Sequence, residues 1–283
     1  MAKTCRLFGL SRQAVYQSVS RIDARRRELE PVKDRVMYWR KYMPQIGVRK
    51  LYRLIKPELE ALEIKIGRDA LFSYLRCEGL LVKPKRNYVK TTYSKHWMKK
   101  HPNLFKDIKV TVPESVFVSD ITYVRSAQGV HYLSLVTDAY SRKIVGYELS
   151  NEMKAIDVVK ALNMAISNRQ YSHEAIHHSD RGLQYCSGLY QSTLRKHNII
   201  PSMTDGYDCY QNALAERVNG ILKQEFLLYQ CNTLDELKQL VRESINIYNE
   251  MRPHLSLQMK TPSEVHQTKK PAMKAGLETV NLF

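Results

Sequence analysis

The sequence contains little of what marks disulfide-rich, fibrous or membrane-spanning proteins. Its 283 residues include 5 cysteines, 11 glycines and 10 prolines. The cysteines are odd in number, widely spaced and without a Cys-x-x-Cys pair, so we expect reduced thiols and neither a disulfide framework nor a zinc cage. The composition excludes a collagen-like or low-complexity chain. No run approaches the roughly 18 apolar residues of a membrane span, and no apolar signal core follows Met1, which predicts a cytoplasmic protein without a membrane partner.

Acidic residues are scarce in the first third of the chain. Residues 1–100 carry 25 Lys and Arg but only 9 Asp and Glu, whereas the other 183 residues carry 20 and 19. The net charges are therefore +16 and +1, in a chain long enough for two domains. This asymmetry predicts a nucleic-acid-binding segment in front of a globular body with another task. Solubility or membrane contact is the alternative explanation of the basic character.

The motifs of nucleotide-driven and covalent catalysis are missing as well. The sequence has neither G-x-x-x-x-G-K-[ST] nor G-x-G-x-x-G, which argues against chemistry driven by a bound nucleotide. Ser179 follows His178, but no G-x-S-x-G elbow presents it as a nucleophile. His177 and His178 lack a cysteine pair or a His-x-x-x-His partner, so we interpret them as strand histidines rather than zinc ligands.

The basic part has the turn residues and the periodicity of short helices. Gly9 in a turn and Ser11 as a capping residue give residues 7–16 the pattern of the second half of a helix-turn-helix, whose first helix is missing. We therefore expect residues 1–20 to be a partial helix-turn-helix remnant. Apolar residues at helical spacing predict a further helix from Pro31.

A helical DNA-binding domain is predicted over residues 21–82. A short basic helix follows Gly47 and is ended or kinked by Pro57, and a second helix follows Gly67 and stops at Gly79. Such a pair of helices can read DNA, although an ordinary small helical bundle has the same pattern. The candidate DNA-binding residues in this domain are Arg49, Lys50, Arg53 and Arg68.

Residues 83–112 show little periodicity and mix basic with aromatic side chains. We predict a basic linker that lies along DNA phosphates, with rings available to stack on bases; a merely solvated linker is the alternative. The candidate DNA-binding residues here are Lys83, Lys85 and Arg86. The aromatic residues are Tyr88, Tyr93, Trp97 and Phe105.

Strand-like runs separated by turns begin after residue 112. Residues 116–124, 130–136 and 143–149 predict a three-stranded meander. The later elements are expected to be a helix from about 155, a strand at 175–178, a helix near 189–195, a strand at 199–203, a helix from about 212 to 228, and a helix capped by Thr233 and Glu236. This order predicts an α/β domain over 113–268, with a mixed five-stranded sheet covered by helices, and a tail at 269–283.

Two acidic residues fall on or next to predicted strands. Asp120 lies in the middle of the first strand, on the same face as Val118, where a carboxylate is costly unless a cation meets it. Asp180 directly follows the strand at 175–178, and such strand ends often gather ligands in α/β sheets. Asp138, in contrast, is interpreted as a turn acid.

A third acidic residue, Glu216, lies on the polar face of the helix that begins near residue 212. A helical wheel places it with Asn219 and Lys223, whereas Glu225 falls on the opposite, apolar side. Two strand carboxylates and one helix carboxylate suit a pair of hard divalent cations that act on a phosphodiester. Taken singly, each acid is better explained as structural; taken together, in this order and beside a basic arm, they favour a metal site.

Several motifs in combination resemble one enzyme family, the DDE integrase-type transposases of bacterial insertion sequences. The similarity is narrower to the second-frame OrfB product of the family that joins OrfA and OrfB by frameshifting. Between Asp180 and Glu216 lie 35 residues, the gap of the D,D(35)E signature. The motifs are Ser119-Asp120-Ile121-Thr122-Tyr123, His178-Ser179-Asp180-Arg181-Gly182, Asn212-Ala213 through Glu216, Tyr248-Asn249 with Arg252-Pro253-His254, and Thr261-Pro262.

The resemblance implies a ribonuclease-H-like integrase core in which Asp120, Asp180 and Glu216 hold two Mg²⁺ ions, for which Mn²⁺ can substitute. It also implies cleavage at the element's end by water, followed by attack of the freed 3′-hydroxyl on another phosphodiester, without a covalent protein–DNA intermediate. Lys223 matches the basic position expected to touch the terminal DNA. Gln211 and Arg217 depart from the family pattern, which affects expected DNA contacts rather than metal ligands.

The partners implied are double-stranded DNA, as terminal inverted repeats and as target, and the OrfA product or an OrfA–OrfB fusion. A homo-oligomer on DNA and a location on the bacterial nucleoid in the cytoplasm are also implied. Two other functions stay open: a ribonuclease-H-type nuclease without strand transfer, and a catalytically inert DNA-binding regulator. The long basic arm favours transposition over the first, and the intact acids oppose the second.

Overall fold

The computed structural model describes residues 5, 7–9, 11–83, 98–106, 108–205 and 212–267. The chain divides into two compact units, residues 1–83 and 84–283. Within the described ranges, no helix combines the length and the hydrophobicity that crossing a membrane requires.

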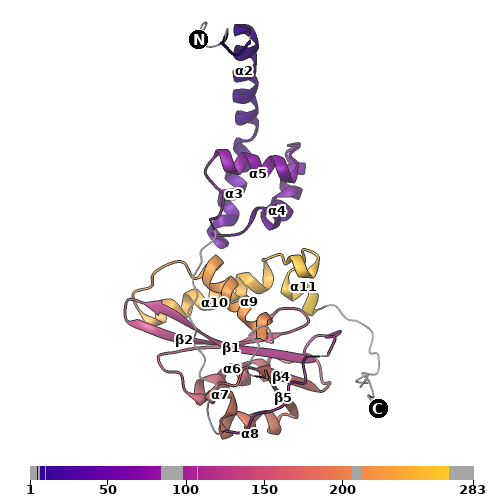
Figure 1. The fold of residues 1–283 in the computed structure, drawn as a ribbon, viewed down its shortest axis with the longest axis vertical. Helices are drawn as coiled ribbons and strands as arrows, with labels where there is room; N and C mark the ends of the chain where they lie inside the picture. Colours follow the sequence, from indigo (N-terminus) through magenta and orange to yellow (C-terminus); the bar gives the residue numbers. More distant parts are fainter. Residues whose placement is uncertain are drawn as a thin grey trace. The chain divides into compact units, whose positions relative to one another are not determined.

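The first unit is helical (Figure 1). Its first long helix begins where the sequence predicts, because the Ser11 hydroxyl accepts a hydrogen bond from the Ala14 backbone N–H at 3.0 Å. This helix runs on past residue 20, and none of the side chains described in it is buried. The helices are α2 (Arg12–Glu28), α3 (Glu30–Tyr42), α4 (Val48–Ala61) and α5 (Arg68–Cys77).

The core of the first unit joins the apolar faces of α3, α4 and α5. Val36, Leu51, Ile55 and Leu71 are fully buried in it. The sequence predicts that Pro57 ends or kinks this helix; it does not end α4, because the helix continues to Ala61. Ile55 and the buried Leu59 flank the proline, so burial of this face offsets the missing backbone N–H.

The second unit is built on a five-stranded mixed sheet in the order β3-β2-β1-β4-β5. The first three strands form the predicted antiparallel meander, and β4 and β5 continue the sheet from β1 in parallel. The strands are β1 (Val116–Ser126), β2 (Gly129–Asp138), β3 (Ile144–Ser150), β4 (Ala175–Ser179) and β5 (Ile199–Met203). The predicted fold class of this part is thereby confirmed.

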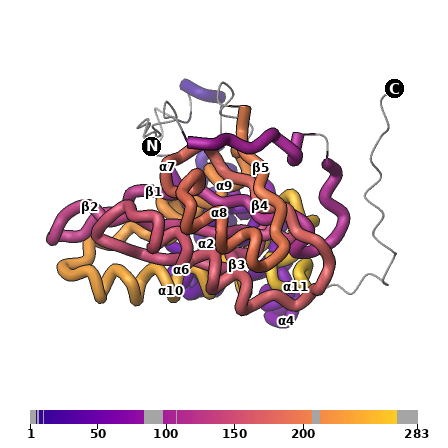
Figure 2. The backbone as a smooth tube through the Cα atoms, turned by 90° about the horizontal axis from the view of Figure 1, so that it is seen from below, coloured from indigo at the N-terminus to yellow at the C-terminus, as the bar shows by residue number. Residues whose placement is uncertain are grey.

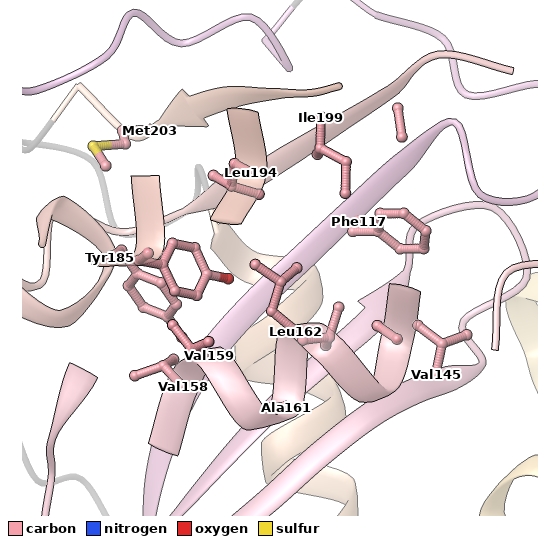
Figure 3. Packing of buried hydrophobic residues seen from close by; sticks show 14 of the residues in the cluster. Phe117, Val145, Val158, Val159, Ala161, Leu162, Tyr185, Leu194, Ile199 and Met203 are labelled. Atoms are coloured by element: carbon pink, nitrogen blue, oxygen red, sulfur yellow. The ribbon is translucent and has the colours of Figure 1, made fainter. Parts of the chain in front are cut away.

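Helices cover both faces of the sheet (Figures 1 and 2). Alternate residues of β1 serve the two faces, because Phe117 joins the core beneath one set of helices while Val118 packs with Ala215 on the other side. Figure 3 shows Phe117 in the larger core with Leu162 and Tyr185. The helices are α6 (Ala155–Ser167), α7 (Leu183–Cys186), α8 (Gly188–Lys196), α9 (Ala213–Ile221), α10 (Leu234–Glu250) and α11 (Pro262–His266).

One glycine lets a helix approach the sheet closely. A Cβ atom at Gly146 in β3 would lie 2.1 Å from the Ala161 carbonyl oxygen of α6. Any larger residue would therefore push α6 away from the strand.

The helix predicted over 212–228 is shorter and changes type. Regular α9 ends at Ile221, and a π-helical turn, η2 (Leu222–Phe226), follows it. In this turn the Leu227 N–H donates to the Leu222 carbonyl at 2.8 Å, five residues back. Side-chain periodicity alone does not reveal such a turn, which is typical of functional regions.

The predicted cap of α10 is half correct. The Thr233 hydroxyl accepts from the Glu236 N–H at 3.2 Å, but the Glu236 carboxylate accepts from the Asn232 N–H instead of completing the box. A complete capping box occurs at α11, between Thr261 and Glu264.

Part of the predicted linker belongs to the second unit. The Leu104 N–H donates to the Ser202 hydroxyl at 2.9 Å, and the Met203 N–H donates to the Pro102 carbonyl at 3.2 Å. Phe105 packs against the His178 ring, with centroids 5.2 Å apart. Phe105 is half-buried in this contact, which opposes the prediction that its ring is available for base stacking. Tyr88, Tyr93 and Trp97 lie outside the described residues.

Candidate active site

The parallel pairing of β1 and β4 brings two of the sequence-predicted acids together. The ladder ends with Ser119 opposite Ser179, so the next residues along the chain are Asp120 in β1 and Asp180 directly after β4. Adjacent parallel strands lie about 4.8 Å apart. The Asp180 carboxylate also accepts from the Gly182 N–H at 3.0 Å, which fixes the turn after β4.

Helix α9 lies along β1 and adds the third acid. The Asn212 amide donates to the Ser119 carbonyl at 3.1 Å, and the Asn219 amide donates to Asp120 Oδ2 at 2.8 Å. Glu216 lies on the same helix face between these two asparagines and is exposed. The structure therefore confirms that these residues share one helix face and shows, beyond the prediction, that the asparagines of this face contact β1.

Lys223 continues this row of contacts from the π-helical turn. Its Nζ donates to Thr122 Oγ1 at 3.2 Å, one strand residue beyond Ile121. Burial lowers the pKa of Lys223, while the nearby charge of Asp120 acts in the opposite direction. A basic side chain thus lies close enough to Asp120 to feel its charge, and its amino group is hydrogen-bonded to Thr122.

The three carboxyl groups influence each other electrostatically. Burial, and next the charge of Asp180, raise the pKa of Asp120 to about 7, while the hydrogen bond from Asn219 opposes this shift. Burial and the charge of Asp180 also raise the pKa of Glu216. The three carboxyl groups lie near the end of the β1–β4 pair, where a bound cation would reduce the repulsion between their negative charges.

The donor set fits hard divalent cations. All three side chains offer carboxylate oxygens, which Mg²⁺ and Mn²⁺ favour over nitrogen or sulfur. In the described ranges, no three His, Cys, Asp or Glu side chains already converge as a complete ligand cage. Glu216 on the helix and the two strand acids are therefore candidates to close around a cation together with water and DNA phosphate.

The two histidines before Asp180 are structural. The hydroxyl oxygens of Ser119 and Tyr190 lie 2.7 and 2.8 Å from His177 Nε2, within the buried core. Burial, and then His178, lower the pKa of His177 to about 3, so its ring is neutral. His178 Nδ1 lies 2.9 Å from the Ser202 hydroxyl. The interpretation of both as strand histidines agrees with these contacts.

Glu225, the other acid considered as a metal ligand after residue 212, forms an ion pair with Arg252 instead. Arg252, which is fully buried, donates from Nε to Glu225 Oε2 at 2.8 Å and from Nη2 to Oε1 at 2.6 Å. The guanidinium also lies 3.0 Å from His254 Nε2 and near the Tyr248 ring. The Tyr248 and Arg252-Pro253-His254 motifs therefore fasten the π-helical turn that follows α9.

The basic candidates of the first unit lie on or next to α4 and α5. Arg49 and Arg53 are exposed one turn apart on α4, and Lys50 is half-buried beside them. Arg68 begins α5 and pairs with Asp69 at 2.9 Å. Lys83 is exposed at the end of the unit, whereas Lys85 and Arg86 lie outside the described residues.

Sequence reasoning missed the part played by Asn219 and a second buried charge cluster. Asn219 was placed on the correct helix face, but its bond to Asp120 has no sequence signal. His266 lies 3.2 Å from both Asp138 Oδ2 and Glu114 Oε1, and all three are almost fully buried. Asp138 does accept from the Ser141 N–H as a turn acid would, and it additionally holds α11 in place.

Comparisons with known proteins agree with this architecture. An integrase core domain matches residues 111–209, and a second integrase core model matches 197–262. The insertion element IS600 31 kDa protein of Shigella sonnei is 34% identical over 258 residues, which cover 89% of this chain and 93% of that protein. Transposase InsF for insertion sequence IS3fB of Escherichia coli is 36% identical over 169 residues, 59% of each chain.

A solved structure supports the fold. A chain of the simian T-cell lymphotropic virus intasome in complex with PP2A regulatory subunit B56 gamma superimposes with a TM-score of 0.52 at 17% identity, over 87% of this chain and 80% of that one. The sequence relatives, the integrase core matches and the mixed sheet with its acidic edge point the same way. The chain belongs to the DDE integrase-type transposases of insertion sequences, the enzymes of DNA transposition.

Proposed function

We propose that this transposase cuts DNA at the ends of an insertion sequence and joins the freed 3′-hydroxyl to target DNA, with Asp120, Asp180 and Glu216 as its catalytic residues. The observation that carries the proposal is the end of the β1–β4 ladder, where two strand acids become neighbours and α9 adds a third. The influence of Asp180 on the pKa of both Asp120 and Glu216 supports the proposal that the three acids form one site.

The three carboxylates would hold two Mg²⁺ ions, or Mn²⁺ in their place. When bound, such ions stabilise the charge on the attacking and leaving oxygens of a phosphodiester. The protein's own contribution is to hold Asp120 by the Asn219 amide and Glu216 by the contacts of α9 with β1. Lys223, beside Thr122, would contact a phosphate of the terminal DNA.

The first unit would supply DNA affinity. Arg49, Lys50 and Arg53 on α4, with Arg68 on α5, would bind backbone phosphates of the element's ends, and Lys83, Lys85 and Arg86 would extend this contact. We propose that residues 21–82 form this DNA-binding part and that 113–268 form the catalytic part. Inverted repeats and target DNA, further copies of the chain, and an OrfA product are the proposed partners.

A strand-transfer assay with labelled insertion-sequence ends and supercoiled target DNA tests the proposal. The full chain should give cleaved ends and joined products with Mg²⁺ and neither without it. Asp120→Asn, Asp180→Asn and Glu216→Gln should each abolish both products while retaining DNA binding. Glu243→Gln, which removes an exposed acid of α10, is the matched control and should retain activity.

The same assay separates the other functions. Cleavage without joined products would indicate a nuclease, and binding without either product would indicate an inert regulator. Full activity of Glu216→Gln would overturn the assignment of the helix acid. Loss of activity in Glu243→Gln would show that charge in general, not the three acids, controls the reaction.

A further inference from the structure

Asn219 donates a side-chain hydrogen bond to Asp120, an acid of the proposed site. Its Nδ2 lies 2.8 Å from Asp120 Oδ2, and the asparagine is 4% exposed. Its other amide atom, Oδ1, is buried and has no hydrogen-bond partner within the part of the chain that the structure describes. Buried side-chain oxygens are nearly always paired, so this one needs a donor.

Chemistry decides which amide atom faces the acid. An ionised carboxylate only accepts hydrogen bonds, and an acid must be ionised to bind a cation. The NH₂ group of Asn219 therefore faces Asp120, and the atom left over is an acceptor. The unpaired atom, Oδ1, is therefore a hydrogen-bond acceptor that lies beside the proposed cation site.

A second asparagine, Asn212, does not make the side-chain contact with an acid that Asn219 makes with Asp120. It lies on the same face of α9, is 5% exposed and also has a buried Oδ1 without a partner among the described atoms. Its amide group, however, donates to the Ser119 backbone carbonyl. Asn212 thus fastens the helix to the strand, whereas Asn219 fixes the orientation of a carboxylate.

A water molecule on a cation is the donor that fits this place. Mg²⁺ keeps several of its waters when it binds carboxylates. The oxygen of such a water faces the cation, so both of its hydrogens are available for donation. One asparagine could then hold the acid through its amide group and the water through its oxygen.

We propose that Asn219 is a positioning residue: it orients Asp120 for a divalent cation and accepts a hydrogen bond from a water of that cation. This inference rests on the proposed function, in which Asp120 is a cation ligand. Residues that orient a metal ligand typically change metal affinity about 10- to 100-fold when they are replaced.

Mn²⁺ alone, titrated into the full chain without DNA and followed by the electron paramagnetic resonance of free Mn²⁺, tests the proposal. Asn219→Leu, which keeps the volume, and Asn219→Ala should each weaken binding by about 10- to 100-fold. Asn249→Ala is the control, because Asn249 is a buried asparagine that pairs with the backbone of Ile144 away from the acids. It should lower the melting temperature and leave Mn²⁺ affinity unchanged.

The outcomes separate the two levels of the argument. If Asp120→Asn loses Mn²⁺ binding while both Asn219 variants bind within twofold of the unaltered protein, the role of Asn219 is refuted and the proposed site stands. If Asp120→Asn binds Mn²⁺ as the unaltered protein does, or if the unaltered protein binds none, the cation site itself is refuted. Equal weakening by Asn249→Ala would show that the Asn219 effect is only loss of folding.

Discussion

The two units of this transposase use charged residues in opposite ways. Residues 1–83 contain 19 Lys and Arg against 9 Asp and Glu, and the candidate DNA-binding arginines Arg49, Arg53 and Arg68 are exposed. The second unit carries 26 Lys and Arg against 19 Asp and Glu over 200 residues, so it is less basic, and it buries charged side chains, among them Arg252 and His266, each 1% exposed. An exposed charge acts at a distance on a polyanion and is screened by salt, whereas a buried charge persists only with its partner.

This difference teaches what each unit can tolerate. In the first unit, the exposed charges Arg49, Arg53 and Arg68 lie outside the core, so we expect their exchange to change DNA affinity and to leave stability nearly unchanged. In the second unit, a substitution at Arg252 or His266 removes one half of a buried pair and leaves the other half without that partner. Four predictions test this contrast, and the expected effects decrease from the first to the last.

Replacing Arg252 should have the largest effect on stability. Arg252→Met leaves Glu225 without its two hydrogen bonds in a largely buried place, and breaking such a pair costs about 3 to 5 kcal/mol. Arg49→Met, on the surface of α4, should change the free energy of unfolding by no more than about 0.5 kcal/mol. Urea unfolding followed by circular dichroism compares the two. Similar unfolding of both variants would contradict the contrast.

A second replacement distinguishes a lost pair from lost packing. Arg252→Met combined with Glu225→Leu removes both charges and should recover part of the stability, because an apolar pair of similar size can take the place of a buried ion pair. If the double variant is as unstable as Arg252→Met, shape and not charge governs this position.

Charge removal in the first unit should act on DNA binding instead. Arg49→Gln with Arg53→Gln removes two exposed charges one turn apart, and each phosphate contact adds about −0.9 to the slope of log affinity against log salt. The slope should therefore become shallower by about 1.8, and affinity should fall roughly tenfold or more. Fluorescence anisotropy at several salt concentrations measures both.

The matched control has the same spacing on the other unit. Lys238→Gln with Arg242→Gln removes two exposed basic residues one turn apart on α10. It should leave the slope unchanged within error. A change as large as that of the α4 pair would place the DNA-binding surface in both units.

The buried cluster of Glu114, Asp138 and His266 should give stability a pH dependence. Burial lowers the pKa of His266, but hydrogen bonds to Asp138 and Glu114 outweigh it and raise the pKa above the ordinary 6.5. A raised folded pKa means that the contribution is complete below pH 6.5 and is lost as pH rises through the folded value. The loss amounts to about 1.4 kcal/mol for each unit of the shift.

The two acids of the cluster have the opposite sign. Their pKa values are lowered, with His266 the first partner that outweighs burial in each case, so their contribution is lost as pH falls below about 4. Melting temperatures from pH 2 to 9 should therefore fall towards both ends. His266→Gln should remove the alkaline decline. A fall above pH 6.5 that survives unchanged in His266→Gln would show that the raised pKa of His266 is not its cause.

The sequence predicted most of the fold because each strand and helix has a local pattern. Residues 199–203 were predicted as a strand and form β5 over the same residues. The alternation that puts Asp120 with Val118 also holds, since both face α9. The roles of Asp120, Asp180 and Glu216 in catalysis stay predictions that the assays above test.

The contacts that the sequence did not predict join residues that are far apart along the chain. His266 meets Asp138 across 128 residues and Glu114 across 152, and Arg252 meets Glu225 in a turn whose π-helical form has no periodicity of its own. Phe105, in a basic stretch, turned out to pack on His178. Tertiary burial decides such contacts, and local pattern carries no information about it.

The smallest effect should come from removing a helix cap. Each unit has a helix whose first turn is capped by a side-chain hydroxyl that accepts from a backbone N–H, so the same loss can be compared in both units. Ser11 caps α2, which has no buried side chain among those described, and Thr261 caps α11, whose His266 is buried between two acids. Loss of a cap generally costs about 1 kcal/mol of helix stability. In Ser11→Ala this loss should appear as fraying of α2, because no core depends on that helix end. In Thr261→Ala the loss should reduce the free energy of unfolding of the whole unit, because His266 stays in place only while α11 is formed.

Hydrogen exchange should therefore accelerate only in α2 for Ser11→Ala, with the melting temperature unchanged, whereas Thr261→Ala should lower the melting temperature by a few degrees. An equal fall in melting temperature for both variants would show that α2 contributes to a core after all, and the contrast between the two units would lose its physical basis.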